Sequence, residues 1–119
     1  MYISENDKVM IRQLVETQLQ AFQQHDEEAA FALMSPAIQE KLNSSDFIAK
    51  VQSSYNAIIK PRAIMFRGFT TMDSYPALVA TIMDEAGELI QGVFVVQHQS
   101  DYSWRIQGYE LVSLDEKIV

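Results

Sequence analysis

Two histidines, His25 and His98, are the only imidazoles in the chain, and the sequence contains no cysteine. His98 falls at the end of an expected strand, in step with Phe94 and Val96 and therefore on the face that they share. If that face is the inner one, His98 lies at the mouth of a pocket and is a candidate ligand-binding residue. The alternative is a partnered or solvent-facing histidine at a strand end. His25 falls in an expected turn between helices, where a histidine commonly contacts the last carbonyl groups of the preceding helix.

Arginine offers a second chemistry, because its guanidinium group binds a carboxylate or a phosphate in a bidentate manner. Arg62 and Arg67 fall on the first expected strand and Arg105 on the last, among apolar residues. Arg67 is therefore a candidate ligand-binding residue; pairing with local acids, or a place at the sheet rim, is the alternative. Arg105 alternates with Trp104, so these two side chains point to opposite faces and do not line one pocket.

Aromatic residues with a polar tip form a third candidate group. The rings of Tyr55, Trp104 and Tyr109 bury area while the O–H or N–H group needs a partner, as in the wall of a ligand cavity. Aromatic residues at helical or strand spacing also occur as plain core residues, which is the alternative. Tyr55 is the third candidate ligand-binding residue.

Other sequence features exclude several kinds of catalysis. Without cysteine there is no thiol nucleophile, thiolate metal ligand or disulfide. Two isolated histidines do not form a metal cluster, and Asp84-Glu85 with Glu88 lacks the spacing of a calcium loop. The sequence also lacks a glycine-rich phosphate loop, a dinucleotide fingerprint and a nucleophile elbow. We therefore expect no catalytic residues, no bound metal and no cofactor.

The spacing of apolar residues predicts helices in the first half of the chain and strands in the second. Ser4 caps a helix of about five turns, Asp26 caps a second helix that Pro36 ends, and a short helical turn follows Pro36. Apolar residues from Phe47 to Ile59 recur at helical spacing and predict one further helix, which Pro61 ends. The expected strands cover 62–71, 77–84, 89–98 and 103–112.

Short connections between the strands favour an antiparallel meander, because parallel strands need long crossovers. We therefore predict one α+β domain over residues 1–119, with three N-terminal helices packed on a curved four-stranded antiparallel sheet. Alternation places Ile64 and Phe66 on one face of the first strand and Met65 and Phe69 on the other. One apolar face meets the helices, and the other is expected to form a homodimer interface.

Composition narrows the expected partners. Sixteen Asp and Glu against nine Lys and Arg give a net charge of −7, which repels phosphate backbones and anionic lipids. We expect no nucleic-acid partner and no membrane partner, and no apolar run approaches the roughly 18 residues of a membrane helix. The N-terminal residues lack the basic and then apolar pattern of a secretory signal, so a cytoplasmic location is expected.

Several local strings, in this order, resemble a short bacterial family without an assigned activity. The similarity covers roughly residues 7 to 112. The strings are Ile11-Arg12-Gln13-Leu14-Val15-Glu16, Gln20-Ala21-Phe22, Ala29-Ala30-Phe31, Ser35-Pro36-Ala37-Ile38, Tyr55, Pro61-Arg62-Ala63 and Trp104-Arg105-Ile106-Gln107-Gly108-Tyr109. That family is similar to the nuclear-transport-factor-2-like or cystatin-like cone fold, in which helices close one side of a curved sheet. Members of this fold usually place a small strand pair where the chain has only Ser35–Ser44, so the resemblance implies a shallower cone here.

The cone fold is also used by ketosteroid isomerase, so the resemblance implies two positions for acid–base chemistry. The oxyanion-donating tyrosine of that enzyme falls at Gln18, and its carboxylate base falls near Leu42. A leucine does not abstract a proton. We therefore expect a non-catalytic domain that binds a small ligand or a protein partner and self-associates. The alternative is an enzyme of the ketosteroid-isomerase-like superfamily that acts on a small molecule in the cone cavity.

Overall fold

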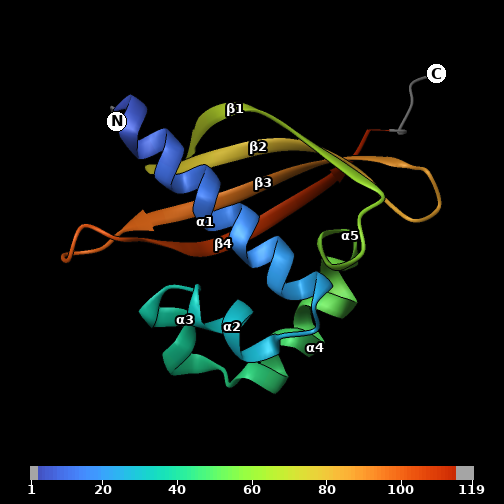
Figure 1. Cartoon of the computed structure of the whole chain (residues 1–119), viewed down its shortest axis with the longest axis horizontal. Coiled ribbons are helices and arrows are strands. Elements are labelled where there is room, and N and C mark those ends of the chain that lie inside the picture. Colours follow the sequence, from blue (N-terminus) through green and yellow to red (C-terminus); the bar gives the residue numbers. More distant parts are fainter. Residues whose placement is uncertain (1–2, 115–119) are drawn as a thin grey trace.

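Residues 3–114 are described by a computed structural model in which five helices precede a four-stranded sheet (Figure 1). The α+β class is confirmed, and five helices replace the three that were expected. The helices are α1 (Glu5–Gln23), α2 (Glu27–Ala32), α3 (Pro36–Lys41), α4 (Ser44–Ser54) and α5 (Asn56–Ile59), and the strands are β1 (Ala63–Met72), β2 (Tyr75–Met83), β3 (Leu89–His98) and β4 (Trp104–Ser113).

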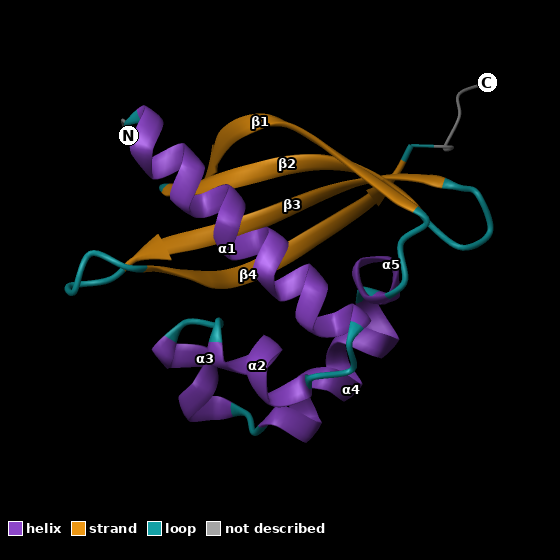
Figure 2. Cartoon of the chain, viewed as in Figure 1, coloured by secondary structure: helices purple, strands orange, loops and turns teal. Residues whose placement is uncertain are grey.

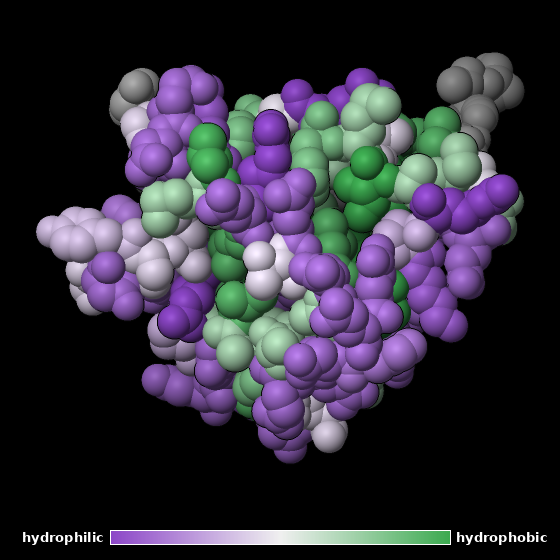
Figure 3. Space-filling view, viewed as in Figure 1, coloured by the Kyte–Doolittle hydropathy of each residue, from purple (hydrophilic) through white to green (hydrophobic). Residues whose placement is uncertain are grey.

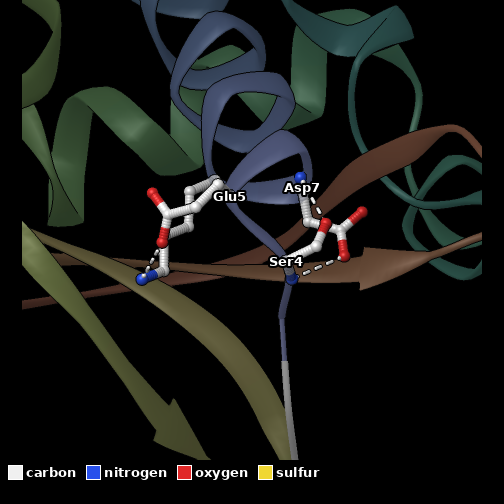
Figure 4. A network of polar contacts seen from close by, with 4 residues as sticks. Ser4, Glu5 and Asp7 are labelled. Carbon is white, nitrogen blue, oxygen red and sulfur yellow. Dashed lines mark hydrogen bonds and ion pairs between the residues drawn. The ribbon is translucent and has the colours of Figure 1, made fainter.

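A capping box starts α1. The Ser4 hydroxyl accepts a hydrogen bond from the Asp7 backbone N–H, and the Asp7 carboxylate accepts one from the Ser4 backbone N–H, each at 3.0 Å (Figure 4). The bond from the Ser4 N–H holds the pKa of the Asp7 carboxyl below its ordinary value. These two bonds satisfy backbone groups that the first turn of a helix leaves without intrahelical partners.

The predicted helix over 47–59 is in fact two helices that meet at Tyr55. Asn43 caps α4 by accepting from the Asp46 N–H at 2.8 Å, and Tyr55 then adopts a non-helical backbone with φ −136° and ψ 38°. Ser53, Ser54 and Asn56 are weak helix formers around this break. The turn allows the short α5 to bury Ile58 and Ile59 in the core.

The sheet is an antiparallel meander with strand order β1-β2-β3-β4, so the predicted strands and their topology are confirmed. Each edge strand is irregular. The β1–β2 register shifts between Phe66 and Gly68, and the β3–β4 register shifts between Val95 and Val96. Bulges of this kind bend a strand and increase its local twist.

The bulge in β1 corrects the predicted placement of Phe69. Phe66 lies opposite Ala80, and Phe69 lies opposite Leu78 after the register shift. Phe69 therefore shares the inner face with Ile64 and Phe66, and strict alternation gave the wrong face for it. Met65 stays on the outer face, where 57% of it is exposed.

Helix α1 crosses the inner face of the sheet, whereas α2, α3 and α4 lie beyond the edge formed by β4 (Figure 2). The core between α1 and the strands is mainly apolar, with Gln18 of α1 as its buried polar member. Its most deeply buried members include Ile11, Val15, Leu78, Ala80, Ile82, Phe94, Val96 and Ile106. Polar side chains cover the outward surfaces of the helices, and apolar side chains lie between the helices and the strands (Figure 3).

Within residues 3–114, none of the helices combines the length and the apolar character that crossing a membrane requires.

The capping box generates a prediction about stability and pH. Because the folded chain holds Asp7 ionised more strongly than the unfolded chain, the contribution of Asp7 is present above its ordinary pKa of 3.8 and is lost as the pH falls through the lower folded pKa. Asp7→Asn should therefore lower the free energy of unfolding at neutral pH, and this difference from the unsubstituted chain should vanish in acid. Urea unfolding at several pH values measures both, with Glu16→Gln on the same helix as the control. A difference that does not change with pH would contradict this account.

Candidate functional site

The connection between α2 and α3 joins the sheet by pairing with the outer edge of β4. The Ile106 N–H donates to the Leu33 carbonyl at 2.9 Å, and the Ser35 N–H donates to the Ile106 carbonyl at 2.8 Å. Met34 is thereby held beside Ile106 in a parallel bridge. The chain then turns away into α3 and returns as α4, so the edge of β4 beyond Ile106 forms one wall of a cleft.

This cleft has a volume of about 220 Å³. Its walls are mainly apolar, and its polar groups come from two tyrosines, a glutamine and one lysine. The lining residues are Met34, Ile38, Leu42, Phe47, Lys50, Val51, Tyr55, Gln107, Gly108 and Tyr109. A concave, largely apolar site with a few polar groups is the usual form of a binding site.

A buried polar network forms the inner end of the cleft. The Tyr109 hydroxyl donates to Gln18 Oε1 at 2.6 Å, and Gln18 Nε2 donates to the Ala30 carbonyl at 2.9 Å. The Met34 sulfur lies 3.2 Å from Gln18 Nε2 and 3.3 Å from the Tyr109 oxygen. Burial raises the pKa of the Tyr109 phenol well above its ordinary value, although the bond to Gln18 opposes this effect. Tyr109 is therefore a neutral donor at physiological pH.

Tyr55 lies over this network from the helical side. Its ring centroid is 5.3 Å from that of Tyr109, which in turn packs edge-on against Phe94. Within the described part of the chain, no hydrogen bond reaches the Tyr55 hydroxyl. The hydroxyl is therefore available to a bound molecule.

Gln107 and Ser35 add polar atoms whose hydrogen-bonding capacity is unused. Gln107 lines the cleft, and its Oε1 is buried with no hydrogen-bond partner among residues 3–114; the same holds for the buried Oγ of Ser35. Burying an unsatisfied polar group costs about 1–3 kcal/mol. A partner that binds at the cleft would remove this cost for Gln107.

The three predicted ligand-binding residues lie in three different places. Tyr55 lines the cleft. Arg67 is exposed at the bulge of β1, where its Nε donates to the Thr81 hydroxyl at 3.0 Å on the outer face of the sheet. His98 is exposed at the end of β3, stacked on Trp104 at a centroid distance of 4.4 Å, with Nε2 3.2 Å from the Tyr102 carbonyl. A ligand-binding role for Arg67 or His98 stays a prediction and is separate from the cleft.

The two positions that the resemblance singled out both border the cleft. Leu42 lines it directly, and Gln18 holds the Tyr109 hydroxyl behind it. Sequence reasoning missed Met34, Lys50 and Gln107, because no local pattern distinguishes them from other residues of a helix turn or a strand. In the structure, Gln107 lies at the bulge of β4 between Ile106 and Gly108, which the sequence does not reveal.

Two larger hollows flank the sheet. One, of about 410 Å³, lies between α1 and β1 and includes Leu19, Arg62 and Phe66. The other, of about 540 Å³, lies between the helices α4 and α5 and the turn that joins β2 to β3. No group of three or more His, Asp or Glu side chains among residues 3–114 is placed to hold a metal ion.

A sequence family described as a domain of unknown function (DUF4864) matches residues 4–119. The chain belongs to this family. For this DUF4864 chain, comparison with curated proteins and with solved structures finds no match. The predicted membership of a family without an assigned activity is therefore confirmed.

The polar network predicts different effects for the two tyrosines of the cleft. Tyr109→Phe leaves Gln18 Oε1 buried without a donor and should lower the free energy of unfolding by about 1–3 kcal/mol. Tyr55→Phe removes a hydroxyl that has no partner and should change stability by less than about 0.5 kcal/mol. Urea unfolding followed by circular dichroism measures both. Equal effects of the two substitutions would refute this description of the network.

Proposed function

We propose that this DUF4864 chain is a non-catalytic binding domain, and that its cleft binds an apolar group carrying a hydrogen-bonding tip. The group belongs either to a free small molecule or to a protein partner. The observation that carries the proposal is the combination, in one apolar cleft, of a buried unpartnered Gln107 oxygen and an unpartnered Tyr55 hydroxyl. The hydrogen-bonding tip of the bound group would donate to the desolvated Gln107 oxygen, and its apolar part would pack against the apolar walls.

The size of the cleft limits what it holds. Its volume of about 220 Å³ is below the roughly 300–1,000 Å³ of sites that enclose drug-sized ligands. The occupant is therefore a single ring or a short branched chain rather than a steroid-sized molecule. Lys50 is the one cation in the lining of the cleft, so an acidic group on the occupant would also be favoured there.

The alternative, an enzyme of the ketosteroid-isomerase-like superfamily, has less support. The cone fold itself remains part of our proposal, supported by α1 across the inner face and by bulges that bend both edge strands. The lining of the cleft, however, contains no carboxylate and no imidazole. Abstraction of a proton from carbon requires such a base within hydrogen-bond reach of the substrate.

Binding of p-cresol, a small aromatic alcohol, tests the proposal. In ¹⁵N-labelled protein, p-cresol should shift the amide resonances of Val51 and Gly108 in a saturable manner. Leu42→Trp should abolish this response, because the indole fills the cleft, while Leu89→Trp on the far side of the sheet should leave it intact. Saturable shifts that persist in Leu42→Trp, or their absence from the unsubstituted chain, would exclude the cleft as the binding site.

A second proposal concerns self-association through the outer face of the sheet. Met65 and Val112 are 57% and 50% exposed there. Thr81 and Gln91 lie between them in the strand register, and Val79, Val93 and Val95 lie on the same face further along the central strands. Strands spaced about 4.8 Å apart with a rise of about 3.3 Å per residue give this four-stranded face an area of roughly 600 Å². A standard interface buries roughly 800 Å² per partner, so a second copy of the chain matches the face in size.

Charge gives the proposed dimer an orientation. Arg67 on β1 and Glu110 on β4 both lie on the outer face, at opposite edges. A two-fold axis parallel to the strands stacks β1 of one copy over β4 of the other and brings these opposite charges together.

A charge reversal tests this dimer by native mass spectrometry and sedimentation. Arg67→Glu should weaken the dimer about tenfold or more, since like charges then face each other. The double variant Arg67→Glu with Glu110→Arg should restore it. A monomeric unsubstituted chain, or a double variant no tighter than the single one, would overturn the proposed interface.

A further inference from the structure

The outer edge of β4 is only half covered by the chain itself. Leu33 and Ser35 pair with Ile106 near the start of the strand. Between Ile106 and the end of β4, residues whose backbone groups point away from β3 alternate with residues whose backbone groups bond to β3.

Two observations fix which backbone groups point outward. Ile106 bonds to Leu33 and Ser35, so its N–H and carbonyl face away from β3, while the Leu114 N–H donates to the Leu89 carbonyl at 2.9 Å and faces β3. Backbone groups of an antiparallel strand point alternately toward and away from the neighbouring strand. With the bulge taken into account, both starting points place the N–H and carbonyl of Tyr109 and Leu111 on the side away from β3. No hydrogen bond in the described part of the chain reaches these groups.

Two hollows lie beside this edge in the part of the chain that the structure describes. The cleft lies next to Gly108 and Tyr109, and the hollow of about 540 Å³ lies next to Leu111 and Ser113. The wall opposite β4 comes from α3 and α4 in the cleft and from α4 and α5 in the hollow, so the two follow one another along the same edge of β4. We call this edge with its two neighbouring hollows the groove. Such a groove provides main-chain partners on one side and side-chain pockets on the other, as peptide-binding sheet edges do.

The two ends of the groove differ in chemistry. The end at Tyr55 and Val51 is apolar. At the far end, the turn between β2 and β3 presents Glu85 and Glu88, which are exposed and form no ion pair with any residue of 3–114. Lys60 is the one cation in the lining there, so carboxylates outnumber it.

From this arrangement we propose that the groove binds an extended peptide that adds to β4 as a parallel strand, with an apolar side chain in the cleft and a lysine or arginine four residues later. This deepens the proposed function, on which it rests, by naming a peptide as the partner. The parallel direction follows the pairing that the chain already makes at Ile106. Four residues of strand span about 13 Å, and side chains two and four positions apart share a face, so both ends of the groove are reached together.

A fluorescein-labelled peptide with the core Leu-Thr-Val-Thr-Lys tests the proposal by anisotropy. The reversed core Lys-Thr-Val-Thr-Leu is the matched control and should bind about tenfold more weakly, since it places the lysine in the apolar cleft. Glu85→Lys with Glu88→Lys should weaken binding of the first peptide by about tenfold at low salt. Glu16→Lys, on α1 beside β1, should leave it unchanged.

A proline at the edge tests the main-chain contribution separately. Leu111→Pro removes an outward N–H without removing a bond of the β3–β4 ladder, and should abolish peptide binding. Leu111→Ala removes more of the side chain than Leu111→Pro but keeps the N–H, and it should bind within a few-fold of the unsubstituted chain. Circular dichroism of both variants establishes that they are folded.

The outcomes separate this proposal from the one it deepens. Saturable p-cresol binding without peptide binding would overturn the peptide proposal and leave the cleft as a small-molecule site. Equal binding of the two peptides, or full binding to folded Leu111→Pro, would also overturn it. Preferential binding of the first peptide, lost in Leu111→Pro and kept in Leu111→Ala, would establish it.

Discussion

The pairing of Ile106 with Leu33 and Ser35 is the contact on which the rest of the structure depends. Two backbone hydrogen bonds of 2.9 and 2.8 Å fix the α2–α3 connection to the edge of β4. They place Met34 beside the Gln18–Tyr109 hydrogen bond and direct α3 away from the sheet. The helices α3 and α4 therefore stand off from β4, and the space they leave is the cleft.

A binding role agrees with the way polar groups are distributed around this cleft. The network of Gln18 and Tyr109 is satisfied internally and holds the inner wall rigid, whereas Gln107 and Tyr55 retain unused hydrogen-bonding capacity. Rigid walls with a few free polar groups lower the cost of ordering a site when it is occupied. The same groups do not supply a base, so the geometry favours recognition over proton transfer.

Much of the fold follows from local sequence, because the apolar spacing changes from helical to strand-like after Pro61 and because α1, α2 and α4 begin at side-chain caps. The sequence does not reveal the face of Phe69, which depends on a bulge, or the break at Tyr55, where weak helix formers yield to burial of Ile58 and Ile59. The site was less predictable still. Gln18 and Tyr109 are 91 positions apart and become partners only when α1 crosses the sheet. Tyr55 was identified because an aromatic ring with a polar tip suits the wall of a ligand cavity, while Lys50 and Gln107 have no local pattern.

The central claim is that the cleft lined by Tyr55 and Tyr109 is where this protein binds its partner. Nuclear Overhauser effects between bound p-cresol and the ring protons of these two tyrosines test it most directly. The account predicts contacts from the p-cresol ring to both tyrosines and to the methyl groups of Val51 and Leu42. Contacts confined to the groove between α1 and β1, with none to Tyr55 or Tyr109, would contradict it.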